Sequence, residues 1–203
     1  MHKSILKPDK SYSFSDYFEL NYSTEDIVAE FGYHYQLAQL TLPQGTADYN
    51  LDKLQTMFYQ KLPYFSLSSE TAKREVFITP ILFELLDYVK LKIDIEYSLY
   101  VNEQLKGTLD YLIRSAQELI VVEAKKADME KGFSQLAVEL IALDHYLDDD
   151  KPILYGAITV GEAWRFGTLD RQQKLISKDI DSFRVPADLF QLFKILMGIL
   201  KPN

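Results

Sequence analysis

The sequence predicts a mixed α/β (α+β) fold, built on a central mixed β-sheet that is flanked by helices. Three segments support this prediction. Residues 91–101 (LKIDIEYSLYV) alternate between apolar and polar side chains, which is typical of a strand with one buried face. Residues 119–122 (LIVV) form a short apolar run rich in β-branched side chains, typical of a strand that is buried on both faces. Residues 132–147 are apolar on almost every side, as expected for a helix buried on more than one side.

The composition is that of a single domain with a substantial core, since the 203 residues are 47% hydrophobic and 13% aromatic. The expected organisation is an N-terminal α/β extension (residues 1–67) packed on a core (residues 68–170), followed by a C-terminal strand and helix (residues 171–203). The chain has no cysteine, which excludes disulfides and thiolate metal sites. It shows neither a signal peptide nor an apolar run long enough for a membrane span. A cytoplasmic protein without a membrane partner is therefore expected.

The N-terminal third contains signals for three helices and one strand. Ser13 and Ser23 each precede a run suited to a short helix, because a serine side chain accepts a hydrogen bond from the first helical turn. Residues 33–42 alternate loosely and predict a strand, which a Pro-Gln-Gly sequence ends. Residues 51–62 have the apolar spacing of an amphipathic helix.

A further helical segment begins at Glu70, after a serine that can cap it, and continues towards Val89. Pro80 lies inside this segment and predicts a kink or a division, because proline lacks the N–H and crowds the preceding turn. The remaining elements follow from alternation, apolar runs and turn residues: strands at residues 105–109, 153–160, 163–167 and 174–180, and a helix at residues 187–200.

Charged residues follow directly on the buried strand. Side chains alternate along a strand, so Glu123 and Lys125 share one face, which is apolar up to that point. Burying such charges is costly unless they are compensated. Asp110 follows the strand at 105–109, and residues 115–118 indicate a turn, so the two strands are expected to pair as a hairpin with Asp110 beside Glu123. Two carboxylates with a lysine one step further indicate a site for a divalent cation.

At these residues the chain resembles the PD-(D/E)XK nuclease superfamily, which has the restriction-endonuclease-like fold. The superfamily's pattern is an Asp at a strand start or bend, a Glu-x-Lys on the next strand and then a helix. The matching residues are Asp110, Glu123 and Lys125, followed by Gln135 on the helix, where several branches carry a glutamine. Leu109 stands where the pattern has proline, a substitution that is common in the superfamily.

A second match lies upstream. Residues 70–82 (ETAKREVFITPIL) are similar to the first helix of the branch found in type I restriction motor subunits and related bacterial proteins. In that branch a Glu leads, an Arg follows four residues later, and an Ile-x-Pro ends the run. The helix-borne acidic residue of the family falls on Glu70. The resemblance covers residues 68–165 and implies a restriction-endonuclease-like core there.

The resemblance implies a Mg²⁺-dependent endonuclease that hydrolyses phosphodiester bonds, with DNA as the expected substrate and Mn²⁺ as an alternative ion. Asp110, Glu123 and the backbone carbonyl of Ala124 are the implied metal ligands, and Glu70 is placed to hold a second metal or its water. Lys125 is expected to orient the attacking water and to stabilise charge on the phosphate. Gln135 is expected to orient Lys125 or the substrate backbone.

The net charge of −8 argues against a nucleic-acid surface, which usually carries a basic patch. The alternative is a catalytically inactive nuclease-fold module for protein interaction or regulation. The chain has no P-loop, so a helicase or restriction-system motor would be a separate partner. Many nucleases of this kind act as homodimers, and the resemblance allows the same here. The sequence leaves open DNA versus RNA, the specificity and the oligomeric state.

Overall fold

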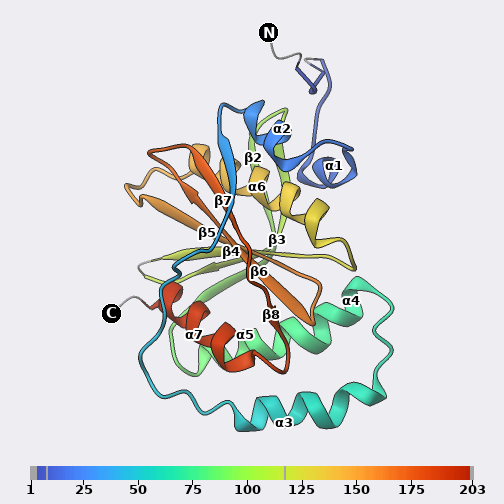
Figure 1. Cartoon of the computed structure of the whole chain (residues 1–203), viewed down its shortest axis with the longest axis vertical. Coiled ribbons are helices and arrows are strands. Elements are labelled where there is room, and N and C mark those ends of the chain that lie inside the picture. Colours follow the sequence, from blue (N-terminus) through green and yellow to red (C-terminus); the bar gives the residue numbers. More distant parts are fainter. Residues whose placement is uncertain (1–3, 8, 117, 202–203) are drawn as a thin grey trace.

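The computed structural model describes residues 4–7, 9–116 and 118–201. Its strands are β1 (His34–Ala38), β2 (Lys92–Asn102), β3 (Leu105–Arg114), β4 (Leu119–Ala124), β5 (Ile153–Thr159), β6 (Ala163–Asp170), β7 (Leu175–Asp179) and β8 (Phe183–Arg184). Its helices are α1 (Phe14–Glu19), α2 (Thr24–Ala29), α3 (Asp52–Lys61), the 3₁₀ turn η1 (Leu62–Tyr64), α4 (Glu70–Lys73), the π turn η2 (Arg74–Ile78), α5 (Thr79–Leu86), α6 (Met129–Tyr146) and α7 (Leu189–Leu200). The predicted α/β class, with a mixed sheet flanked by helices, is confirmed (Figure 1).

The sheet has the order β1-β7-β6-β5-β4-β3-β2, with β8 beside β6. Strands β2, β3 and β4 are antiparallel neighbours, whereas β4 and β5 are parallel. A parallel pair needs a crossover connection, which α6 supplies. At the far edge, β1 joins β7 in parallel, so the N-terminal third contributes a strand to the sheet.

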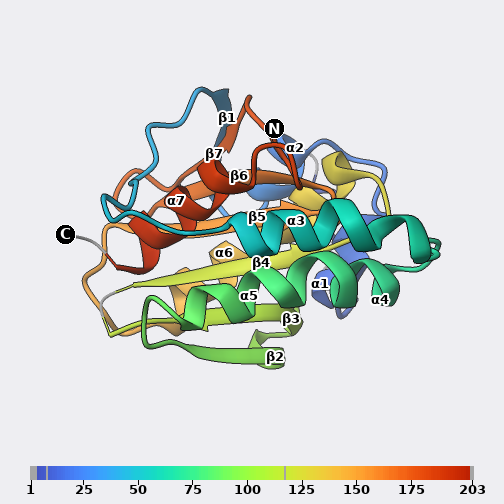
Figure 2. The same ribbon diagram turned by 90° about the horizontal axis from the view of Figure 1, so that it is seen from below.

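Two hydrophobic layers hold the helices to the sheet. Val121 of β4 belongs to the layer that contains α1, α2 and α6, and Val122 belongs to the layer that contains α3, α5 and α7. Figure 2 shows α3, α5 and α7 on the same side of the sheet. All six residues of β4 are buried, which confirms a strand covered on both faces. Within the described residues, no helix is long and apolar enough to cross a membrane.

Most predicted elements are present, with ends that differ by a few residues. The main difference concerns β3, which continues to Arg114, so that Asp110 lies within the strand rather than at its end. The strand continues because residues 111–113 are apolar and pair with β4. The turn at 115–118 is confirmed by the Ser115 N–H, which donates to the Glu118 carbonyl at 2.8 Å; Gln117 lies outside the described residues. The sequence does not predict β8 or η1.

The kink or division predicted at Pro80 takes the form of a π turn, residues 74–78, that precedes the proline within an unbroken helical segment. The Thr79 N–H donates to the carbonyl of Arg74, five residues back, and the Thr79 hydroxyl donates to the same oxygen at 3.2 Å. Because proline lacks an N–H and crowds the turn before it, the wider π turn accommodates the ring without ending the helix. The segment from Glu70 to Leu86 is therefore continuous.

Gly198 allows α7 to approach the backbone of residues 43–44. A Cβ at this position would lie 2.4 Å from both the carbonyl carbon of Pro43 and the nitrogen of Gln44. We expect Gly198→Ala to lower the free energy of unfolding by about 2 kcal/mol, because overpacking against backbone forces the chain to shift. Urea denaturation measures this change, and an unaltered midpoint would contradict the close approach.

Candidate active site

The register of β3 and β4 brings the two predicted carboxylates together. Tyr111 pairs with Val122, so the next positions along the two strands, Asp110 and Glu123, lie opposite each other. The Ala124 N–H donates to Oδ2 of Asp110 at 2.8 Å, which fixes this carboxylate against β4. The hairpin therefore places the acid of one strand beside the acid of the next.

Glu123 is 1% exposed and lies among polar partners. Its Oε1 accepts a hydrogen bond from Nε2 of Gln135 at 2.7 Å and forms an ion pair with Lys125. Its Oε2 receives no hydrogen bond from an N–H or hydroxyl group of the described residues, but the carboxyl of Glu139 forms a hydrogen bond with that of Glu123. Burial, and then the charge of Asp110, raise the pKa of Glu123 to about 7, and Lys125 offsets this only in part. Glu123 is therefore a buried carboxyl within a polar network of Gln135, Lys125 and Glu139.

Lys125 keeps its proton. Its side chain is 15% exposed, and its Nζ lies 5.3 Å from the centroid of the Phe18 ring. Burial favours the neutral amine, but the charges of Glu123 and Asp110 outweigh it and raise the pKa of Lys125. Lys125 is therefore suited to stabilising negative charge rather than to removing a proton.

Helix α6 supplies two buried polar side chains to the site, Gln135 and Glu139. The sequence predicts only Gln135 as a site residue. Nε2 of Gln135 donates to Glu123 and also to Oε1 of Glu139, at 2.8 Å. Glu139 is fully buried, and this burial, together with the charge of Glu123, raises its pKa well above the ordinary value. The sequence signal for Glu139 is an acidic residue within the otherwise apolar run 136–143. Gln135 thus donates to Glu123, and its expected role in orienting Lys125 or the substrate backbone stays a prediction.

Arg74, to which the sequence assigns no role, lies beside Asp110. Its Nη1 is 3.6 Å from Oδ1 of Asp110 and 3.7 Å from Oε1 of Glu96, and its Nε donates to the Tyr111 hydroxyl at 3.1 Å. Glu96 has a φ of 56°, a conformation that is uncommon for residues with a side chain. It lies where the β2–β3 ladder is interrupted, opposite Asp110. Two charged groups therefore flank Asp110 on the side away from β4.

A pocket with a volume of about 390 Å³ lies in front of these residues. Glu70, Lys125 and Gln135 line it, so three of the five predicted catalytic residues face one space. Asp110 and Glu123 do not line the pocket; the side chain of Asp110 is 16% exposed and Glu123 is buried. Lys125 thus lines the pocket, Glu123 is buried behind it, and Asp110 is as exposed as Lys125 but lies outside the pocket lining.

The oxygen donors suit a hard cation such as Mg²⁺. Within the described residues, no three His, Asp or Glu side chains are grouped to hold a metal. Mg²⁺ requires only one or two carboxylates, because it retains several waters. The Asp110–Glu123 pair supplies two adjacent carboxylates, which fits this requirement. The roles of Glu70 and of the Ala124 carbonyl as ligands stay predictions.

No protein-family model matches the chain, and no match to a curated protein is found.

Proposed function

We propose that the protein is a Mg²⁺-dependent nuclease that hydrolyses phosphodiester bonds in nucleic acid, with DNA as the expected substrate. The observation that supports this most is the convergence of Asp110, Glu123 and Lys125 from adjacent strands. The proposal includes a restriction-endonuclease-like core. The succession β2, β3, β4, α6 and β5, in which β4 and β5 are parallel, supports that part of it.

The proposed chemistry assigns a task to each of these residues. When bound, Mg²⁺ supplies positive charge to the phosphate oxygens and favours the ionisation of water. Asp110 and Glu123 would hold the ion, and the Ala124 N–H and Gln135 keep these two carboxylates in orientation. Lys125, which stays protonated, would donate to the phosphate and stabilise the negative charge that develops during attack.

Calorimetric titration of the protein with MgCl₂ tests the metal site directly. We expect saturable binding that Asp110→Asn weakens at least about tenfold, because one of the two carboxylates is then neutral. Asp94→Asn is the matched control, since Asp94 also lies on the sheet and is also paired with an arginine, Arg114. Titrations with MgCl₂ and MnCl₂ that both show no binding would contradict the proposal.

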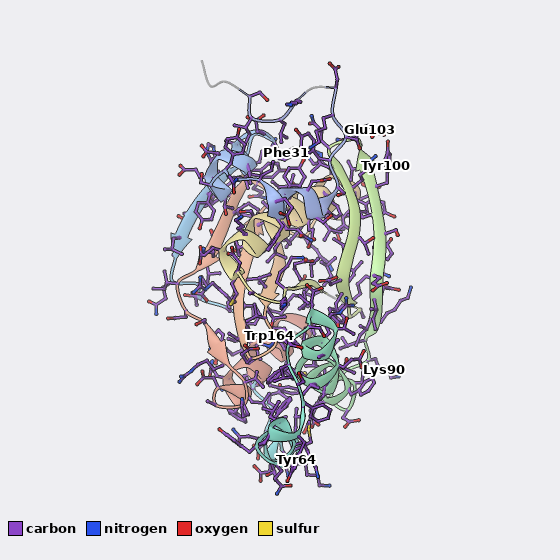
Figure 3. All side chains as sticks on the ribbon, turned by 90° about the vertical axis from the view of Figure 1, so that its right-hand side faces the viewer. Phe31, Tyr64, Lys90, Tyr100, Glu103 and Trp164 are labelled. Atoms are coloured by element: carbon purple, nitrogen blue, oxygen red, sulfur yellow. The ribbon has the colours of Figure 1, made fainter. Side chains whose placement is uncertain are left out.

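The second candidate function, an inactive nuclease-fold module for protein interaction or regulation, is favoured by a different observation. Each carboxylate already has a basic partner, Arg74 for Asp110 and Lys125 for Glu123, so the cluster is compensated without an ion. Tyr64, which is 84% exposed, projects at the end of the molecule opposite Phe31 and offers an aromatic contact for another protein (Figure 3). A protein that binds no divalent cation would support this function.

A further inference from the structure

We infer, resting on the proposed nuclease function, that the substrate is single-stranded nucleic acid and that α1 is the wall that excludes a duplex. The pocket in front of Lys125 has a volume of about 390 Å³. This lies at the lower end of the range of sites for small ligands, and a single nucleotide unit is a ligand of that class. A space of this size has room for one nucleotide unit of a single strand around the phosphate to be cleaved.

Helix α1 closes one side of this pocket. Ser15, Phe18 and Glu19 line it, and the Phe18 ring lies against Lys125. Glu70, at the start of α4, also lines the pocket. A phosphate that approaches Lys125 thus passes between α1 and the beginning of α4, at the point where the proposed chemistry takes place.

Helix α1, which forms the wall, is fixed to the sheet and to the hydrophobic layer that it shares with α2 and α6. Phe14 and Tyr17 of α1 are buried, and the Tyr17 hydroxyl donates to the carbonyl of Gln104 at 2.7 Å. Gly107 has a φ of 146°, and a Cβ there would lie 2.8 Å from the Phe14 ring, so the ring fills the space that a side chain would need. A helix held by these contacts does not swing aside to admit a second strand.

The charges at the pocket also suit a substrate with few phosphates. Two lysines and three acids line the pocket: Lys125, Lys126, Glu19, Glu70 and Asp128. Proteins that bind long duplexes neutralise many phosphates with lysine and arginine. A rim with more acids than bases engages only one or two phosphates. Phe18 supplies an aromatic surface on which a base of a single strand can stack.

The test compares cleavage of a short single-stranded oligonucleotide, as DNA and as RNA, with cleavage of the duplex formed with its complement, in MgCl₂ or MnCl₂. We expect at least one of the single strands to be cleaved at least about tenfold faster than the duplex, the effect of one base–aromatic stack. The logarithm of kcat/KM should fall against the logarithm of salt with a slope of about −1.4, which is about −0.7 for each of two phosphates.

The outcomes separate this inference from the proposed function. If the duplex is cleaved as fast as the single strand, the inference of a single-stranded substrate is overturned, but the proposed nuclease function is not. Hydrolysis of bis(p-nitrophenyl) phosphate without cleavage of any oligonucleotide also overturns the inference alone. Hydrolysis of none of these compounds, together with no Mg²⁺ or Mn²⁺ binding in the titration, overturns the proposed function and the inference with it.

Substitution of Phe18, on the side of α1 that lines the pocket, tests the inference independently. Phe18→Leu keeps an apolar side chain beside Lys125 but removes the stacking surface, so we expect KM for the single strand to rise about tenfold. Phe18→Trp, which keeps an aromatic ring at this position, should restore the wild-type KM for the single strand. The matched control is Phe83→Leu, at an exposed phenylalanine of α5. An unaltered KM in Phe18→Leu would overturn the role of this wall.

Discussion

Phosphodiester hydrolysis is expected to fall about 10³-fold in Asp110→Asn and in Lys125→Met, because each change removes a preorganised charge from the reacting phosphate. Asparagine at position 110 retains an oxygen that can accept the Ala124 N–H, so the hairpin should stay intact. Methionine at position 125 retains an unbranched chain beside Phe18 while removing the cation. Single-turnover cleavage of a labelled single-stranded oligonucleotide measures both losses.

Two substitutions outside the site serve as controls. Asp94 and Lys92 form an ion pair on β2, so Asp94→Asn and Lys92→Met make the same chemical changes elsewhere on the sheet. Both should cleave the oligonucleotide at the wild-type rate. Undiminished cleavage by Asp110→Asn or Lys125→Met would assign the activity to another site and contradict the proposed roles.

The metal-free protein is expected to lose about 3 kcal/mol of its free energy of unfolding as the pH rises from below 4.5 to above about 7. Burial raises the pKa of Glu123 from 4.5 to about 7 in the folded protein. A carboxyl with a raised pKa binds its proton more tightly in the folded state. The resulting stability is complete below the ordinary pKa and is lost as the pH rises through the folded pKa. Glu139, whose pKa is also raised, extends the loss in the same direction.

Urea denaturation over this pH range, with EDTA present, measures the effect. Glu123→Gln cannot ionise at this position, so its stability should depend much less on pH. Glu130→Gln is the control: hydrogen bonding to Lys178 lowers the pKa of Glu130, which places its contribution at more acidic pH. Excess MgCl₂ should restore stability above about pH 7, because an ion that binds the carboxylate form stabilises the folded state. A wild-type protein that becomes more stable as the pH rises would contradict the buried, protonated Glu123.

The part of the site that lies on strands can be predicted from the sequence, because a strand has a fixed period of two. Alternation puts Glu123 and Lys125 on one face, and the short turn at residues 115–118 fixes the register that brings Asp110 beside them. The fold class follows from equally local signals, such as the buried run of β4 and the apolar α6. The ends of strands are predicted less accurately from the sequence. The alternation predicts Asp110 at the end of its strand, but pairing with β4 extends β3 to Arg114.

The residues that depend on packing between distant segments do not follow from the sequence. Gln135 and Glu139 are one turn apart on α6, but they meet Glu123 because of how α6 crosses the sheet, which the nearly uniform apolar surface of α6 does not specify. Phe18 reaches Lys125 only because α1 docks where Gly107 leaves room for Phe14. Arg74 reaches Asp110 from a separate helix, through contacts between segments far apart in the chain.

The π turn before Pro80 sets how far α4 is rotated about the helix axis relative to α5. An α-helix advances about 100° per residue, so the extra residue that a π turn accommodates rotates α4 by about that angle relative to α5. Ile81 and Leu82 fix α5 in the core; the rotated α4 then carries Glu70 to the pocket, and Arg74, the first residue of the π turn, lies beside Asp110. A chain one residue shorter here would keep the same side chains and direct them elsewhere. The spacing between Glu70 and Pro80 thus determines where the side chains of Glu70 and Arg74 lie, in addition to being part of the sequence match.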